Sequence, residues 1–332
     1  MKRLLSLTLA LILAFSLCAC TGSESEETLV HEDTTPADFT EIRVAVLNGT
    51  TGFGIAPLYS DIQSGNDHNM TAKIDFYADA TLVAPLVIGG SVDVAAVPTN
   101  LAAVLYNKTK GAIEVLAVNT LGVLYLVENG ENVKSLSDLA GKTVYLPGSG
   151  SNPEYGLKTL LELSGLSDKV TLDYTYATPD ELTAALASGK ASLGVLPEPK
   201  VTAAMTKNAS LKVAVDFSKE WKTLTGTELV QGCIIARKEF IDAHPVAVDN
   251  FLKAYKESVN TLNSDPEKAA AAVVAAGIAA NENLVKNALP RCNVTYLVGD
   301  EMKNALNEFW GALYAQVPSS VGGTLPDESI FG

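Results

Sequence analysis

Short apolar runs alternate with longer amphipathic stretches between residues 40 and 200 of this 332-residue chain. Runs 44–47 and 143–146 have the length of short strands, and each leads into a loop rich in glycine, serine and threonine. Short apolar strands separated by helical stretches are typical of a parallel sheet with helices packed on both faces. The pattern therefore predicts an α/β fold.

This strand–loop–helix pattern occurs twice. Segment 41–100 aligns without gaps over segment 140–199, at an offset of 99 residues. Glycines and prolines at the ends of strands and helices are common to α/β proteins in general, but the order of the matches here favours an internal duplication. Two copies predict two doubly wound lobes. The identical residues at strand and helix ends are Gly49 and Gly148, Tyr77 and Tyr176, Ala78 and Ala177, Gly90 and Gly189, and Pro98 and Pro197.

Three further strands are predicted, and the lobes are expected to be joined by two hinge strands. Apolar runs 112–118 and 123–128 are connected through 119–122, and Val230–Arg237 follows the second copy. If the chain leaves the first lobe through the connected runs 112–118 and 123–128 and returns through Val230–Arg237, these two crossings are the natural hinge. One lobe then holds residues 40–123 and 235–332, and the other holds residues 124–234. Because ligands of open α/β sheets bind beyond the carboxyl ends of the strands, we expect a site between the lobes.

The chain from Lys238 onwards is predicted to be a C-terminal helical segment. Pro245 opens one helix, and a second, alanine-rich helix runs from Pro266 to about Gly277. The apolar stripes of this segment have helical spacing, so we interpret them as core packing. They are Val248, Phe251, Leu252 and Tyr255 in one helix, and Met302, Leu306, Trp310 and Leu313 in the last one.

The first residues predict an export signal. Lys2 and Arg3 precede the apolar run Leu4–Leu17, which is shorter than the roughly 20 residues of a spanning helix. The run ends in Leu-Cys-Ala-Cys20, which resembles a bacterial lipobox, with an ordinary small-residue cleavage site as the alternative. We expect residues 1–19 to be a signal peptide and Cys20 to carry a lipid on the outer face of the cytoplasmic membrane. Residues 20–39, acidic and rich in serine and threonine, would be a flexible tether.

The net charge of the chain and the motifs it lacks argue against several classes of function. A net charge of −14, from 24 basic and 38 acidic side chains, argues against a nucleic-acid partner. The three histidines have no spacing for a metal site or a catalytic dyad, and no nucleophile or dinucleotide motif occurs. We therefore expect a protein that is not an enzyme and needs no cofactor or metal. Beyond the leader, Cys233 and Cys292 are interpreted as buried free thiols, with a disulfide as the alternative.

Polar loops at the predicted strand ends are suited to hold a small molecule. Asn152 is a plausible N-cap and Pro153 the first helical residue, so free backbone N–H groups would point outwards at this loop. Ordinary helix capping is the alternative for each loop taken singly. The candidate ligand-binding residues in the loops are Asn48, Gly49, Thr50, Thr51, Phe53, Thr99, Asn100, Gly148, Ser149, Ser151, Asn152 and Glu198, and the aromatic plates near them are Phe53, Tyr125, Tyr155 and Trp221.

Several motifs together resemble a known family. They are the lipobox, residues 90–100 (GSVDVAAVPTN), residues 137–144 (SDLAGKTV), residues 148–151 (GSGS) and residues 196–199 (LPEP). In order and spacing they resemble the solute-binding proteins of ABC importers, in the nitrate, sulfonate, taurine and thiamine-precursor group, also called NitT/TauT or SsuA/THI5-like. The resemblance implies a two-lobed type II periplasmic-binding-protein fold, a small-molecule solute, permease subunits as partners and no catalysis.

Two other functions on this fold stay open as alternatives. One is an exported sensor that signals to a receptor. The other is an enzyme that makes the thiamine pyrimidine, which we disfavour because this chain has an export signal and lacks the cysteine-rich motif of those enzymes.

The candidate loops lack the charge that an anionic solute prefers. None of Arg43, Arg237 and Arg291 lies in them, whereas Glu154 and Glu198 do and Asp79 is adjacent. A carboxylate at a helix start opposes a bound anion. We therefore expect a neutral or cationic solute, ring-bearing if the aromatic plates contact it, which a monomer captures when its two lobes close.

Overall fold

A computed structural model of the chain describes residues 36–130, 132–148 and 152–332. The predicted signal peptide and lipidated Cys20 lie outside these residues, as does most of the tether. Among the described residues, no helix is both long and apolar enough to cross a membrane.

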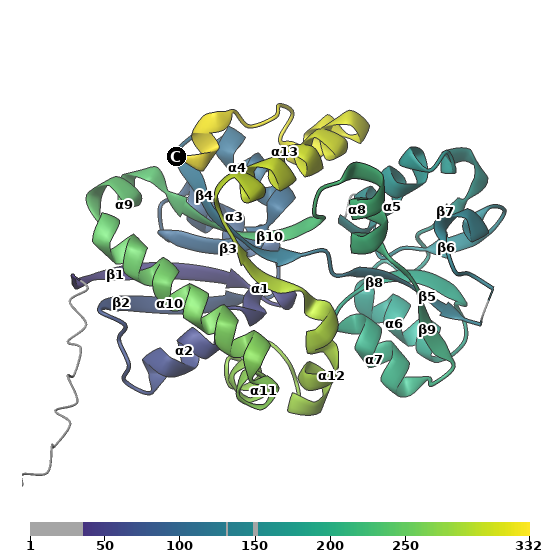
Figure 1. The fold of residues 1–332 in the computed structure, drawn as a ribbon, viewed down its shortest axis with the longest axis horizontal. Coiled ribbons are helices and arrows are strands. Elements are labelled where there is room, and N and C mark those ends of the chain that lie inside the picture. Colours follow the sequence, from purple (N-terminus) through teal and green to yellow (C-terminus); the bar gives the residue numbers. More distant parts are fainter. Residues whose placement is uncertain (1–35, 131, 149–151) are drawn as a thin grey trace, which may run out of the picture. The chain divides into compact units, whose positions relative to one another are not determined.

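The first sheet, sheet A, has six strands in the order β11-β4-β10-β3-β1-β2 (Figure 1). Strand β1 pairs in parallel with β2 and β3, whereas β10 runs antiparallel to β3 and β4. Sheet A with its helices forms lobe 1. The strands are β1 (Asp38–Leu47), β2 (Met70–Tyr77), β3 (Val94–Pro98), β4 (Ile113–Leu121), β10 (Val230–Arg237) and β11 (Val294–Leu297).

The second sheet, sheet B, has five strands in the order β7-β6-β8-β5-β9. Strand β6 pairs in parallel with β7 and β8, and β5 runs antiparallel to β8 and β9. Sheet B with its helices forms lobe 2. The strands are β5 (Leu124–Asn129), β6 (Thr143–Tyr145), β7 (Thr171–Asp173), β8 (Leu193–Pro197) and β9 (Leu211–Asp216).

The two lobes confirm the internal repeat. Each contains three parallel strands in the same spatial order, β2-β1-β3 and β7-β6-β8, beside one antiparallel strand. Helix α3 (Ala80–Ile88) and helix α6 (Pro179–Ala187) have bounds that differ by the predicted offset, as do β3 and β8. The sheets are mixed and not purely parallel, because β5 and β10 arrive from the opposite lobe and run against their neighbours.

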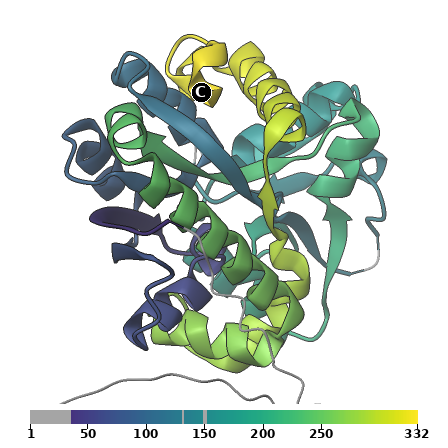
Figure 2. The same cartoon turned by 60° about the vertical axis from the view of Figure 1, so that its left-hand side comes forward.

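Alternating side chains of each sheet face two different cores, as the two-residue period of a strand requires. In sheet A, Ala45, Ala95 and Val97 pack towards α3, α4 and α13, whereas Val44 and Val46 pack towards α2, α10 and α11. Figures 1 and 2 show the long helix α10 crossing the second of these faces. These helices are α2 (Ala56–Gln63), α4 (Thr99–Lys108), α10 (Pro245–Ser264), α11 (Pro266–Ala275) and α13 (Gly299–Gln316).

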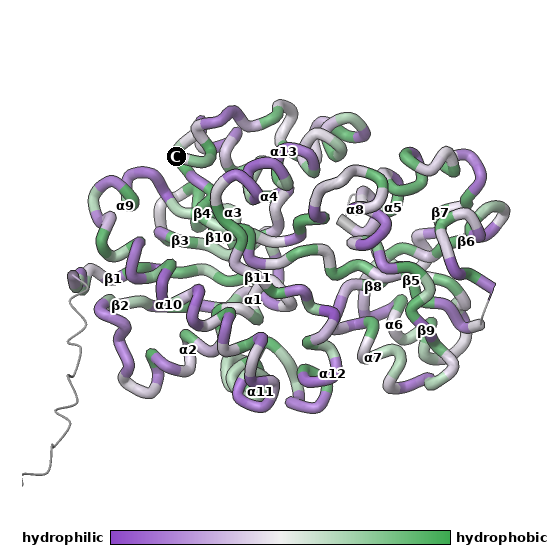
Figure 3. The backbone as a smooth tube through the Cα atoms, in the orientation of Figure 1, coloured by the Kyte–Doolittle hydropathy of each residue, from purple (hydrophilic) through white to green (hydrophobic). Residues whose placement is uncertain are grey.

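Sheet B is covered in the same way. Tyr125, Val127 and Leu196 pack with helices α6 and α7 in a cluster of their own, and the opposite face packs with α5 and α8. That second cluster is continuous with the α13 side of lobe 1. Strands inside both sheets, such as β3 and β5, accordingly appear as hydrophobic stretches in Figure 3. The remaining helices are α1 (Thr50–Phe53), α5 (Asn152–Leu163), α7 (Lys200–Lys207), α8 (Phe217–Thr225), α9 (Lys238–Ala243) and α12 (Glu282–Cys292).

The chain passes between the sheets at two places. Strand β4 ends at Leu121 and β5 begins at Leu124, so Gly122 and Val123 form the first crossover. The second follows α8. Strand β10 lies in sheet A from Val230 onwards, so the return to lobe 1 comes before the expected boundary at residue 235.

The C-terminal segment confirms the predicted core stripes. Phe251, Tyr255, Leu306, Trp310 and Leu313 are each at most 1% exposed. Strand β11 interrupts the predicted helices, because Asn293 adopts a left-handed conformation (φ 44°) that ends α12 and turns the chain onto the edge of sheet A. Cys233 and Cys292 are free and buried, which confirms the interpretation as free thiols.

Candidate functional site

The carboxyl ends of β3 and β8 both lie beside the first crossover. In lobe 1, Pro98 at the end of β3 is opposite Gly232, which also pairs with Thr120 near the end of β4. In lobe 2, Pro197 at the end of β8 is opposite Leu124. Because β1 and β6 run parallel to β3 and β8, the loops that follow them start from the same ends of the two sheets. The arrangement places the predicted loops of each lobe on the side that faces the crossover.

Two side chains of β4 donate hydrogen bonds to the backbone that follows β1. The backbone carbonyls of Thr50 and Thr51 accept hydrogen bonds from Thr120 Oγ1 (3.5 Å) and Asn119 Nδ2 (3.1 Å). Gly49 has φ +95°, a conformation that favours glycine. The side-chain Oδ1 of Asn48 is buried and has no hydrogen-bond partner. A buried amide oxygen of this kind is a candidate contact for a polar ligand atom.

The two candidate residues that follow β3 differ: Thr99 has a structural role, whereas Asn100 stays a candidate for the site. Thr99 is completely buried, its Oγ1 donates to the carbonyl of Val230 (3.1 Å), and its own carbonyl accepts from Trp310 Nε1 (2.9 Å). These contacts give Thr99 a role in holding α4 and α13 together. Asn100 is half-buried in the first turn of α4, which no side chain caps.

The matching loop of lobe 2 is described only in part. Ser149 and Ser151 lie outside the described residues, as does the side chain of Asn152, where α5 begins one residue before the predicted Pro153. Gly148 has φ +68°. Glu154 in the first turn of α5 is buried and accepts hydrogen bonds from Lys158 Nζ (2.5 Å) and Tyr174 Oη (2.8 Å). Lys158 thus offsets the negative charge of Glu154.

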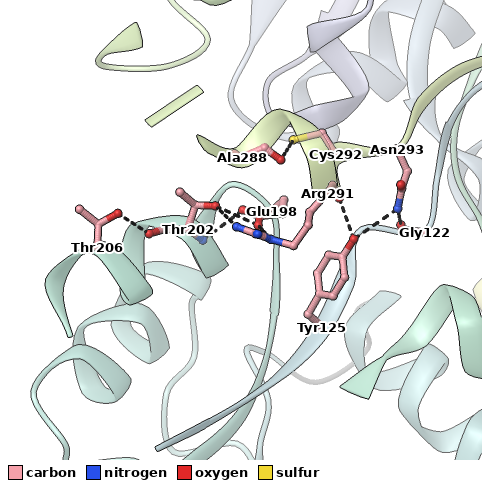
Figure 4. A network of polar contacts seen from close by, with 9 residues as sticks. All are labelled: Gly122, Tyr125, Glu198, Thr202, Thr206, Ala288, Arg291, Cys292 and Asn293. Atoms are coloured by element: carbon pink, nitrogen blue, oxygen red, sulfur yellow. Dashed lines mark hydrogen bonds and ion pairs between the residues drawn. The ribbon is translucent and has the colours of Figure 1, made fainter. Parts of the chain in front are cut away.

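Glu198, directly after β8, takes part in a network that sequence reasoning missed (Figure 4). Its carboxylate accepts from Arg291 Nε (2.5 Å) on α12 and from the backbone N–H (3.1 Å) and Oγ1 (2.9 Å) of Thr202 on α7. Arg291 Nη2 also donates to Thr202 Oγ1 (2.7 Å). Burial raises the pKa of Glu198 above its ordinary value, and Arg291 and Thr202 offset this only in part.

Tyr125 extends the same network towards the crossover. Its hydroxyl donates to the carbonyl of Arg291 (2.9 Å) and accepts from Asn293 Nδ2 (3.3 Å), which also donates to the carbonyl of Gly122 (2.6 Å). Burial raises the pKa of Tyr125, so the hydroxyl stays protonated and can donate. The polar end of this ring is therefore used by the protein itself.

Two of the four predicted aromatic plates are part of the core. Phe53 and Trp221 are completely buried. The ring of Trp221 lies 5.6 Å from that of Phe309, centre to centre, and its Nε1 donates to Thr227 Oγ1 (3.3 Å). Neither ring presents a face to a solute here, because apolar neighbours cover both. Tyr155 is 8% exposed and packs in the same core cluster as Trp221.

Each arginine of the described residues contacts a carboxylate. Arg43 Nη2 and Arg237 Nη2 lie 2.6 Å and 2.8 Å from Asp93 Oδ1, and Arg291 holds Glu198. Burial raises the pKa of Asp93, but hydrogen bonds from both arginines outweigh it and hold that pKa below its ordinary value. The described residues contain no group of three or more histidine, cysteine or acidic side chains placed to bind a metal ion.

Comparison with known proteins gives a family and a fold. The sequence model of the NMT1/THI5 like family matches residues 53–269. An ABC transporter structure from Parabacteroides distasonis aligns with a TM-score of 0.74 and 26% identity, over 88% of this chain and 99% of that one. A comparison with curated protein sequences gave no match.

Two more distant structures share the fold. The periplasmic aliphatic sulphonate binding protein SsuA from Escherichia coli aligns with a TM-score of 0.69 and 17% identity, over 85% of this chain and 90% of that one. The alkanesulfonate-binding protein SsuA from Xanthomonas axonopodis pv. citri, bound to MOPS, aligns with a TM-score of 0.61 and 16% identity, over 88% of this chain and 96% of that one. The fold is that of the periplasmic binding proteins, as predicted.

Proposed function

Because the chain belongs to the NMT1/THI5-like family and has the fold of the periplasmic binding proteins, we propose that it is the solute-binding component of an ABC importer. In this function it captures a small molecule between its lobes and delivers it to permease subunits in the membrane. It performs no catalysis. The sensor and thiamine-pyrimidine alternatives gain no support from the contacts described above.

The observation that carries this proposal is the position of the strand ends. Pro98 is one strand away from the end of β4, and Pro197 is opposite the first residue of β5, so the loops that follow β3 and β8 begin on either side of one short crossover. A rotation about the crossover changes the distance between these loops. A solute that contacts both lobes then stabilises the closed form by the contacts it gains there.

The charges near the loops favour a neutral or cationic solute. Arg43 and Arg237 are held by Asp93 at the start of β3, away from the loops that follow its other end. Of the arginines in the described residues, only Arg291 lies at a candidate loop, and a sulfonate or nitrate would have to displace Glu198 to bind it. Breaking a buried ion pair of this kind is costly. Asn48, Asn100 and the loop that begins at Gly148 are the proposed contacts for the polar atoms of the solute.

The predicted export signal completes the proposal. Cys20, once acylated, would hold the protein at the outer face of the cytoplasmic membrane as a monomer close to its permease. Replacement of Cys20 by serine should release the protein from the membrane fraction. Continued membrane association of that variant would show that another segment anchors it.

A thermal-shift screen tests solute binding. Probes should cover thiamine precursors, sulfonates such as taurine, polyamines such as spermidine, and neutral heterocycles. A binder at about 100 times its dissociation constant stabilises the folded state by about 2.7 kcal/mol. We expect a neutral or cationic probe to raise the melting temperature, whereas a response to sulfonates alone would contradict the proposed solute charge.

Asn100→Ala should abolish the shift while the protein without solute melts as before. Asn260→Ala is the matched control, because it removes an exposed asparagine from the outer surface of α10. An undiminished shift in Asn100→Ala would remove Asn100 from the site.

A further inference from the structure

We propose that Arg291 and Glu198 form a latch between the two lobes that sets how readily the site opens. The inference rests on the proposed function, because a latch is useful only if the lobes move relative to each other. It assigns a role to two residues that need not touch the solute.

The two residues of the latch belong to different lobes. Helix α12 is fixed in lobe 1, because its buried residues Val285, Ala288 and Cys292 share a core cluster with α10 and α11. Glu198 lies between β8 and α7, and α7 packs on sheet B through Val201 and Ala204. The bond from Arg291 to Glu198 therefore crosses from one lobe to the other.

The surroundings of Glu198 allow the contact to be made and broken. Its side chain is 0% exposed, and its partners within lobe 2 are the backbone N–H and hydroxyl of Thr202. When the lobes separate, the carboxylate keeps both of these bonds and exchanges Arg291 for water. The side chain of Arg291 is already 31% exposed, so its guanidinium is readily hydrated as well.

The C-terminal end of α12 is attached at the crossover. Asn293 Nδ2 donates to the carbonyl of Gly122, and the Tyr125 hydroxyl donates to the carbonyl of Arg291 (Figure 4). Groups at a pivot move little when two bodies rotate about it, whereas the guanidinium of Arg291 reaches beyond it to α7. We therefore expect the crossover contacts to persist on opening while the bond to Glu198 breaks.

Neighbouring ion pairs on the same helices stay within one lobe. Lys286 on α12 pairs with Glu267 on α11 at 2.9 Å, and Lys200 on α7 pairs with Asp180 on α6. Loss of such a pair changes the surface charge of one lobe without changing what holds the lobes together. Lys286→Met is thus a matched control for Arg291→Met, since each removes one cation from α12.

The test measures the distance between the lobes in the absence of any solute. Spin labels are placed on cysteines introduced at the exposed positions Lys73 in β2 and Lys190 after α6, with Cys18 and Cys20 replaced by serine. Cys233 and Cys292 are buried and remain unlabelled. Pulsed electron resonance then gives the populations of short and long interlobe distances for each variant.

We expect Arg291→Met to raise the ratio of open to closed populations at least about tenfold, the factor for the loss of one charge-assisted hydrogen bond, because it removes the bonds to both Glu198 and Thr202. Glu198→Gln should raise it less, because Arg291→Met strands a fully buried carboxylate whereas Glu198→Gln leaves a partly exposed guanidinium. The double variant should open less than the sum of the two single effects. Lys286→Met should match the parent.

Unchanged distances in both Arg291→Met and Glu198→Gln would overturn the latch, as would an equal opening in Lys286→Met. Circular dichroism checks folding. If Arg291→Met unfolds, Arg291→Lys replaces it in the test: a lysine keeps the charge but lacks the guanidinium fork that reaches both Glu198 and Thr202, so the open-to-closed ratio should rise above that of the parent. An unchanged ratio in Arg291→Lys would overturn the latch in that case.

If the latch fails but spermidine, taurine or a thiamine precursor still raises the melting temperature, the proposed function stands. If the latch holds and no probe in the screen binds, the proposed function fails alone.

Discussion

The two lobes meet in different ways on the two sides of the molecule. On the α13 side, one apolar cluster runs from lobe 1 into lobe 2, and Trp221 of α8 packs against Phe309 of α13. On the α12 side, the cores of the lobes are separate clusters, and Arg291, Glu198 and Tyr125 bridge them by polar contacts.

This difference indicates which contact changes when the site opens. Apolar surface returned to water costs about 25 cal/mol per Å², with no compensating bond. A polar contact exchanges its partner for water at a much smaller net cost. We infer that the α13 side stays packed through opening and closing. On the α12 side, the bond from Arg291 to Glu198 breaks on opening, whereas the contact of Tyr125 at the crossover persists.

The largest effect is expected from a change on the apolar side. Trp221→Ala removes a completely buried ring and should lower the free energy of unfolding by about 3–5 kcal/mol. Urea denaturation measures this, with Trp221→Phe as a control that keeps an aromatic ring and should cost less than half as much. If Trp221→Ala cost under about 1 kcal/mol and instead abolished solute binding, Trp221 would be the ligand plate that the sequence suggested.

A smaller effect is expected at the crossover between the two sides. A Cβ added at Gly122 would lie 2.7 Å from Leu229 Cδ2 and closer still to Ser218 Oγ. Overpacking of this kind costs about 1–3 kcal/mol, so Gly122→Ala should lower the midpoint of urea unfolding. Gly311→Ala is the control, because its Cβ would meet nothing within 4 Å in the middle of α13. It should be neutral or stabilise by up to about 1 kcal/mol. Equal midpoints for the two variants would show that the crossover is not tightly packed.

The sequence predicted the fold well because the fold depends on local signals that occur twice. The repeated glycines and prolines end strands and helices, so the offset between segments 41–100 and 140–199 placed α3 over α6 and β3 over β8. Strand β11 was missed because it is short and follows a helix directly. The left-handed turn at Asn293 that creates it has only a weak signature, an asparagine at a helix end.

The site was harder to predict because its contacts are not local. Arg291 and Glu198 are 93 positions apart, and no spacing rule brings a helix end to a strand end over that distance. Aromatic residues suit both a core and a ligand plate, so sequence position alone could not assign Phe53 and Trp221 to the core. Burial, which decides between the two, is a property of the folded chain.

Small-angle X-ray scattering of the wild-type protein, with and without a saturating solute from the thermal-shift screen, tests the central claim most directly. Capture between the lobes predicts a smaller radius of gyration in the presence of that solute, and the same solute should leave the radius of Asn100→Ala unchanged. An identical radius for the wild-type protein with and without saturating solute would contradict closure of the two lobes around a shared guest.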